Sequence, residues 1–274
     1  MIIKNISNKN PADDFGITPL HYAAEGGYFN VCKLIMKQNI ANRNPGNLNG
    51  ITPLHKAAKE SHMKICILLI ENIDDKNPTD INGNTPLHIA ALVGNLAIWN
   101  EIAMYEPDKN LETKYKQTVF EIAAVHDQPQ ICQMVLIWKG YEILQNDGFG
   151  IKQLHHAAYF GCLDTYKLIA AHFDDKNPTV PTDPSLETPL HLAAEKGHLE
   201  LCIWIMDNLD NKSPVKSDGT TPLHIAAKSG NWHLYHVIQD KLVEKNPIDN
   251  SGITTKKLWK NSARNQQNGN CTIL

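Results

Sequence analysis

Apolar and polar positions along this chain repeat with a period of about 33 residues. Each period holds a short apolar run with helical spacing, as at residues 85–91, and a second apolar run, as at residues 199–206. A glycine usually separates the two runs, and a polar stretch ending in proline follows the second, as at residues 74–78. Glycine favours the backbone conformation that ends a helix, and proline cannot continue one. The pattern therefore predicts a series of helix pairs joined by short turns and longer loops.

The first run of each period begins with Thr-Pro-Leu-His or with an altered form of that motif. A threonine side chain can accept hydrogen bonds from the open N–H groups of a first helical turn, and proline suits the first helical position. The motif therefore predicts where each first helix begins. Intact copies begin at Thr18, Thr52, Thr85, Thr188 and Thr221, and altered copies at Thr118, Lys152 and Thr254.

A period near 33 residues that carries Thr-Pro-Leu-His-x-Ala resembles the ankyrin-repeat family. The resemblance implies an all-α solenoid of helix-turn-helix repeats with β-hairpin or loop fingers, about seven full repeats and partial units at both ends. We expect one array over residues 1–262, whose first residues form a truncated unit, and a flexible tail at residues 263–274. The repeats are expected near residues 12–45, 46–78, 79–111, 112–145, 146–181, 182–214 and 215–247, with a partial unit at 248–262.

The fourth and fifth periods depart most from the motif. The fourth has Val119 in place of proline, Glu121 in place of histidine and Asp127 in place of the glycine between the helices. The fifth has lost both threonine and proline, and the step to the sixth holds three additional residues within 178–185. That insertion is rich in proline, which predicts a longer and stiffer finger.

Charge and hydrophobicity limit the class of partner and the compartment. The chain has 274 residues, 42% of them hydrophobic, and a formal net charge of −3. A nucleic-acid-binding domain usually carries a basic surface, so we expect no nucleic-acid partner. No apolar run reaches the 18 or so residues of a membrane span, and the first residues lack the pattern of a signal peptide. We therefore expect the protein in the cytoplasm or the nucleus.

Most cysteines and histidines follow the repeat pattern and indicate no chemistry. Cys32, Cys66, Cys132 and Cys202 occupy one position of the second helix, and no Cys-x-x-Cys pair occurs. In the ankyrin family the motif histidine forms local hydrogen bonds that hold repeat ends together, so the resemblance assigns these histidines to the scaffold. No phosphate-binding loop, nucleophile elbow or zinc-protease motif is present. We expect no catalytic residue, no cofactor and no metal.

A candidate binding surface emerges from the residues that follow the Ala-Ala pair of each repeat. The family resemblance implies that partners bind the finger tips and the concave side of the first helices. These positions are charged or small in the flanking repeats and apolar or aromatic in repeats three to five. Contiguous exposed apolar residues with a polar rim usually mark an interaction site. The predicted partner-binding residues are Leu92, Val93, Val125, His126, Tyr159 and Phe160 after the Ala-Ala pairs, and Tyr115, Phe149 and Ile151 at finger positions.

Several alternatives stay open at this point. The same side chains could fill gaps left by the altered fourth repeat, or they could meet a second copy of the protein. The favoured function is a non-catalytic scaffold that binds a protein or peptide. The alternative is a membrane-tethered adaptor, a host-directed effector, or the repeat region of a larger ankyrin-containing enzyme or channel. Residues 271–274 fit the C-a-a-X motif, in which Cys271 would be prenylated.

Overall fold

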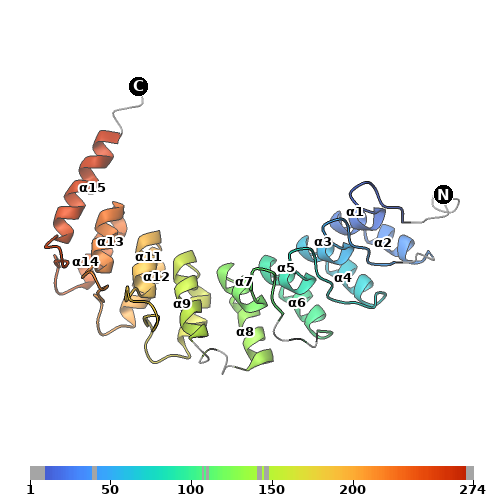
Figure 1. Ribbon diagram of the computed structural model, residues 1–274, viewed down its shortest axis with the longest axis horizontal. Coiled ribbons are helices and arrows are strands. Elements are labelled where there is room, and N and C mark those ends of the chain that lie inside the picture. Colours follow the sequence, from blue (N-terminus) through green and yellow to red (C-terminus); the bar gives the residue numbers. More distant parts are fainter. Residues whose placement is uncertain are drawn as a thin grey trace. The chain divides into compact units, whose positions relative to one another are not determined.

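The computed structural model describes residues 10–38, 42–106, 108, 111–140, 144 and 148–269, with side chains up to residue 262. These residues form seven helix pairs and a final single helix (Figure 1). The first helices of the pairs are α1 (Pro19–Glu25), α3 (Pro53–Lys59), α5 (Pro86–Val93), α7 (Val119–Val125), α9 (Phe149–Phe160), α11 (Pro189–Lys196) and α13 (Pro222–Ser229). The second helices are α2 (Phe29–Met36), α4 (Met63–Ile70), α6 (Leu96–Ala103), α8 (Pro129–Lys139), α10 (Leu163–Ala170), α12 (Leu199–Asp207) and α14 (Trp232–Lys241), and α15 (Thr255–Gly269) follows them. The predicted all-α repeat solenoid is confirmed.

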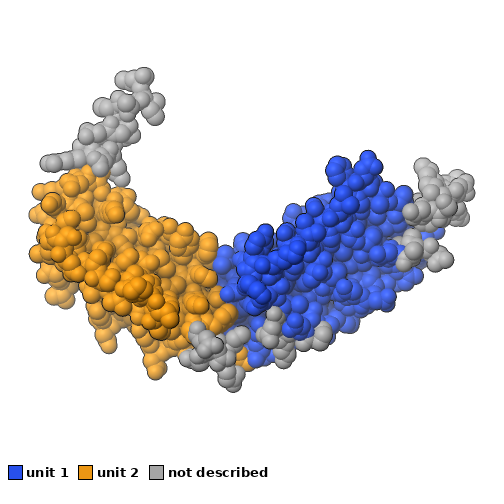
Figure 2. Space-filling view, viewed as in Figure 1, with its two compact units in different colours: residues 1–139 blue, residues 140–274 orange. Residues whose placement is uncertain are grey.

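The contacts between residues divide the chain into unit 1 (residues 1–139) and unit 2 (residues 140–274), coloured separately in Figure 2. In unit 1 the first helices α1, α3, α5 and α7 pack in one layer, and the second helices α2, α4, α6 and α8 in another. In unit 2 the first helices α9, α11 and α13 pack in the same way, and α15 packs on α13. The motif leucines and the Ala-Ala pairs are buried between the layers. That residues 1–262 form one continuous array stays a prediction.

The motif histidines link each repeat to the next. The Thr52 N–H donates to His55 Nδ1 over 3.1 Å, so this nitrogen carries no proton and Nε2–H is the donor. That N–H donates to the carbonyl of Asn84, at the next finger, over 3.1 Å. The scaffold role implied for the motif histidine is therefore confirmed. The same links join His21 to Ile51, His191 to Thr220 and His224 to Ile253.

The histidine link is interrupted at the altered fourth repeat. His88 is 1% exposed, and its Nε2 makes no well-formed hydrogen bond with any described residue; a weaker interaction with the Leu111 backbone raises its pKa, against the larger lowering by burial. In repeat four Glu121 replaces the histidine, and its carboxylate accepts from the Thr118 N–H over 2.8 Å. Glu121 therefore keeps the cap of α7, but a carboxylate has no N–H with which to continue the link to the next finger.

Helix α9 begins earlier than the motif predicts, because repeat five has neither the threonine cap nor the proline. Its first turn includes Phe149 and Ile151, which we expected at a finger tip. Gly148, with φ of 72°, makes the turn that precedes the helix. The finger placement of Phe149 and Ile151 is thus corrected to a helical one.

Four residues other than glycine adopt left-handed backbone where other repeats have glycine: Ser61, Lys116, Asp127 and Leu186. Leu186 has φ of 54° in the finger of repeat six, and its counterpart in the next finger is Gly219 with φ of 78°. A side chain with a Cβ is strained in this region by about 1–2 kcal/mol. Leu186 is also 47% exposed, so little packing offsets the strain.

We therefore expect Leu186→Gly to raise the free energy of unfolding of unit 2 by about 0.5–1 kcal/mol, as measured by urea denaturation. The matched change is Gly252→Ala, at the same turn of repeat eight. Gly252 has φ of 74°, and an added Cβ would meet no atom within 4 Å, so the backbone strain is isolated. We expect Gly252→Ala to lower stability by about 1 kcal/mol. A loss of stability in Leu186→Gly would contradict the argument.

Two sequence-based expectations concern the ends of the chain. Helix α15 continues to Gly269, past the boundary expected at residue 262, because no proline or glycine interrupts it earlier. The truncated first unit and the C-a-a-X motif with Cys271 lie outside the described residues.

Candidate functional site

In unit 1 the predicted binding residues lie at the ends of two neighbouring first helices and in a finger. Leu92 and Val93 occupy the last turn of α5, and each is 37% exposed. Val125 is half-buried at the end of α7, and His126, which follows it, is exposed. Tyr115, in the finger before α7, is 72% exposed. Because α5 and α7 pack side by side, the apolar ends of both helices belong to one side of unit 1.

In unit 2 the predicted residues fall into two separate pairs on α9. Tyr159 and Phe160 end the helix, are 42% and 50% exposed, and their rings meet edge to face with centroids 5.0 Å apart. Phe149 and Ile151 are half-buried in the first turn. A helix rises about 1.5 Å per residue, so roughly 15 Å of helix separates the two pairs. The structure thus brings Tyr159 and Phe160 together and leaves Phe149 and Ile151 apart from them.

The next repeat holds Tyr159 in place. The ammonium of Lys196 lies 4.3 Å from the centroid of the Tyr159 ring, and it is 3.0 Å from the carboxylate of Glu195. The hydrogen bond to Glu195, with the interaction with Tyr159, raises the pKa of Lys196. His198 Nε2 donates to the Tyr159 carbonyl over 3.0 Å. An aromatic side chain that is already held in place loses less entropy on binding.

The core of the altered fourth repeat is filled by its own Phe120. This residue stands where the motif has leucine, and it is 1% exposed. The side chains of Tyr159 and Phe160 are exposed at the surface of unit 2. Their role in binding a partner stays a prediction.

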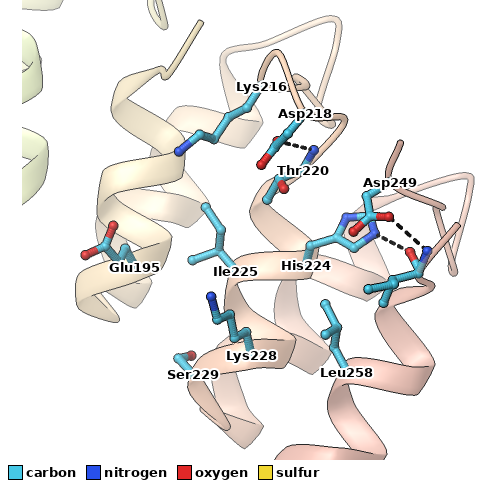
Figure 3. A pocket seen from close by; sticks show the side chains of 11 residues that line it. Glu195, Lys216, Asp218, Thr220, His224, Ile225, Lys228, Ser229, Asp249 and Leu258 are labelled. Carbon is cyan, nitrogen blue, oxygen red and sulfur yellow. Dashed lines mark hydrogen bonds between the residues drawn. The ribbon is translucent and has the colours of Figure 1, made fainter. Parts of the chain in front are cut away.

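Sequence reasoning missed a hollow of about 700 Å³ in unit 2, between α11, α13 and α15 and the fingers before them (Figure 3). Ile225 and Lys228 of α13 line it, three residues apart on one face of the helix. Lys216 of a finger pairs with Glu187 over 2.6 Å. The Thr220 N–H donates to Asp218 over 2.9 Å, and this bond lowers the pKa of that carboxyl. The sequence signal for this hollow is Ile225, the apolar residue between His224 and the Ala-Ala pair of repeat seven.

The described residues were compared with the patterns of metal sites and membrane-spanning helices. No group of three or more His, Cys, Asp or Glu side chains among them could hold a metal ion. None of the described helices is long and apolar enough to cross a membrane.

Burial lowers the reactivity expected of the thiols. Cys32, Cys66, Cys132, Cys162 and Cys202 are all buried, and none of them forms a disulfide. Desolvation raises the pKa of Cys32 to about 11 and the pKa of Cys66 and Cys202 to about 12. Since only the thiolate reacts, native Cys66 and Cys202 should be slow nucleophiles at neutral pH.

We expect these thiols to react with a maleimide at least ~1,000-fold more slowly in the native than in the unfolded protein. The measurement is mass spectrometry of a Cys271→Ser variant, labelled with and without guanidinium. We also expect no intramolecular disulfide under non-reducing conditions. A native disulfide among the repeat cysteines, or fast labelling of Cys66 or Cys202, would contradict the prediction.

Comparisons with known proteins agree with the repeat geometry. A family model described as "Ankyrin repeats (3 copies)" matches residues 1–80, 120–214 and 154–249, and one described as "Ankyrin repeat" matches residues 82–112. Among solved structures, the crystal structure of the human ASB11 ankyrin repeat domain superimposes with a TM-score of 0.60 at 19% identity. The match covers 82% of this chain and 97% of that domain, and at this identity it shows the fold alone. No curated protein matches the chain.

Proposed function

We propose, because this chain belongs to the ankyrin-repeat family, that it is a non-catalytic module that binds a protein or peptide through its first helices and fingers. Ankyrin repeats are generally protein–protein interaction modules and are typically non-catalytic. A fold alone does not name a partner, so the proposal rests on the surface residues of this chain.

The aromatic pair Tyr159 and Phe160 carries the proposal. Both rings are exposed, they contact one another, and Lys196 of the next repeat orders the first of them. Leu92 and Val93 occupy the same position in repeat three, where repeat two has Lys59 and Glu60. Aromatic side chains at the centre of an interface commonly dominate its binding energy.

The test compares binding with stability in the double variant Tyr159→Ala/Phe160→Ala. A partner captured by the wild-type protein is identified by mass spectrometry, and its affinity is then measured for each variant. We expect the double variant to bind at least ~30-fold more weakly, since one anchor commonly contributes ~2 kcal/mol. Because both side chains are exposed, we expect the melting temperature to change by no more than ~2 °C.

The matched control is Lys228→Ala/Ser229→Ala, the equivalent pair of repeat seven, for which we expect less than a ~5-fold change in affinity. A lower melting temperature with unchanged affinity would show that Tyr159 and Phe160 fill the core instead. Capture of the same chain would favour self-association.

As part of the same proposal, the protein acts in the cytoplasm or the nucleus. The described cysteines are buried and form no disulfide, which supports a reducing compartment. Imaging of a fluorescently tagged protein tests this. A membrane location that Cys271→Ser abolishes would favour the prenylated adaptor.

A further inference from the structure

Unit 1 has an apolar groove on its second helices, whereas the predicted binding residues of the same unit belong to the first helices and a finger. The groove has a volume of about 590 Å³ and lies between α6 and α8. Trp99 and Trp138 meet in it edge to face, with ring centroids 6.1 Å apart. Met104 and Ile137 are 71% and 58% exposed at its margin. The volume falls within the range of about 300–1,000 Å³ that ligand sites usually have.

The groove arises from an exchange of side-chain sizes in repeat three. Trp99 stands where repeats one, two and four have a buried cysteine. Four residues later, one helical turn along α6, Ala103 stands where α4 and α8 have Ile70 and Leu136. Ile70 and Leu136 are buried, whereas Ala103 is half-buried and lines the groove. The large indole fills the core, and the small alanine leaves the space beside it open.

Trp99 carries a hydrogen-bond donor that nothing accepts. The residue is 2% exposed, and its Nε1 has no hydrogen-bond partner in the described part of the chain. Repeat five provides a direct comparison. Tyr166 occupies the same position there, and an alanine, Ala170, again stands four residues later. Its hydroxyl donates to the Lys176 carbonyl over 2.6 Å. A buried N–H without an acceptor lowers the stability of the fold, and the Tyr166 hydroxyl shows how an acceptor removes that cost in repeat five.

The charge at the groove is of one sign. Among the described residues that line it, the ionisable ones are Glu101 and Glu106, and both are acidic. Glu106 accepts hydrogen bonds from the Asn77 side chain and from the Asp108 N–H, both over 2.8 Å. Glu101 has no ion pair or hydrogen bond with any residue that the structure describes. A cationic side chain seated beside the two carboxylates would complement them, and it could also lie against the indole faces.

We propose that the groove between α6 and α8 binds a short amphipathic peptide segment that carries large apolar side chains and a lysine or arginine. The apolar side chains occupy the space beside Trp99 and Ala103. The cationic group pairs with Glu101. This mode is that of a helix in a groove, in which one apolar face supplies the contact and flanking charges supply the specificity. It is independent of the proposed binding residues, which belong to the first helices and the fingers.

Selection from a random 12-residue peptide display library tests the proposed chemistry. Wild-type protein is the bait, and the variant Met104→Ser/Ile137→Ser is used for counter-selection. Both substituted side chains are exposed, so the fold should be retained. We expect the enriched peptides to combine leucine, methionine or aromatic residues at helical spacing with lysine or arginine. Enrichment of acidic peptides, or no enrichment specific to the wild-type protein, overturns the proposal.

Affinity measurements on the best selected peptide place it in the groove. We expect Met104→Ser/Ile137→Ser to weaken binding at least ~10-fold, and Glu101→Lys to weaken it ~3-fold to ~10-fold with a smaller dependence on salt. The matched control is Leu34→Ser, which removes an exposed apolar side chain from α2, where Leu34 is 48% exposed. This control should bind like the wild type. Equal loss in the control would show nonspecific hydrophobic binding.

Nuclear magnetic resonance supplies a readout at the proposed contacts. With labelled methionine methyl groups, Met104 and Met134 should shift on binding, whereas Met63 and Met206, which do not line the groove, should not. Shifts confined to the first-helix surface would overturn the proposal. A doubled mass in light scattering that Met104→Ser/Ile137→Ser abolishes would also overturn it, because the occupant would then be a second copy.

Discussion

Lowering the pH from 7.5 to 4.5 is expected to reduce the free energy of unfolding of each unit by ~2–3 kcal/mol through one buried histidine. Burial lowers the pKa of His88 in unit 1 and of His191 in unit 2 from 6.5 to about 4 in each case. His21 and His55 have pKa values lowered by the same cause and act in the same direction. Each pKa unit is equivalent to about 1.4 kcal/mol.

The direction follows from which state binds more protons. Between pH 6.5 and about 4 the unfolded histidine is protonated, while the folded one stays neutral because the charged form would be desolvated. Stability is therefore complete above pH 6.5, falls as the pH falls towards 4, and no longer changes through these groups below that value. Urea denaturation at several pH values, followed by circular dichroism, measures the slope.

The variant His191→Gln isolates the effect in unit 2. A glutamine oxygen can accept from the Thr188 N–H, as the Glu121 carboxylate does from Thr118 in repeat four. We expect lower stability at pH 7.5 but a smaller loss on acidification. The control His233→Gln changes an exposed histidine and should leave the pH dependence as it is. An unchanged slope in His191→Gln would refute the assignment.

Replacing Phe120 with alanine is expected to reduce the free energy of unfolding of unit 1 by about 3–5 kcal/mol. The side chain is 1% exposed and fills the position that leucine has in the other repeats. Removing the ring forfeits its burial and leaves a cavity that packed helices cannot close completely. Urea denaturation measures the loss, and the slope of the transition shows whether unfolding stays cooperative.

Two further variants bracket this result. Phe120→Leu restores the residue type of the other repeats and should change stability by less than about 1.5 kcal/mol. Tyr115→Ala, in the finger of the same repeat, removes a side chain that is 72% exposed and should stay within about 0.5 kcal/mol. A loss below about 1 kcal/mol in Phe120→Ala would show that other side chains fill the core of repeat four.

The periodic parts of the fold could be predicted from residues close together in the chain. Thr-Pro starts a helix, and the glycine after Ala-Ala ends one, through hydrogen bonds that span three or four residues. The same spacing identified the buried cysteines. Repeat five escaped prediction because it has no start signal, so Phe149 and Ile151 entered α9.

The geometry of the candidate surfaces depends on residues that lie about one repeat away along the chain. The ordering of Tyr159 comes from Lys196 and His198, which belong to the following repeat.

The amino-acid sequence by itself determined the repeat family, the order of the helices and the positions that are buried in every repeat. Each follows from local backbone preferences and from the recurring period. Only the tertiary structure decided that the Trp99 indole N–H has no acceptor among the described residues, while the Tyr166 hydroxyl, at the same position of repeat five, donates to a carbonyl. Both residues bring a large aromatic ring to their helices. Whether a buried donor meets an acceptor depends on where another segment passes through space, and that position is set by how the repeats pack.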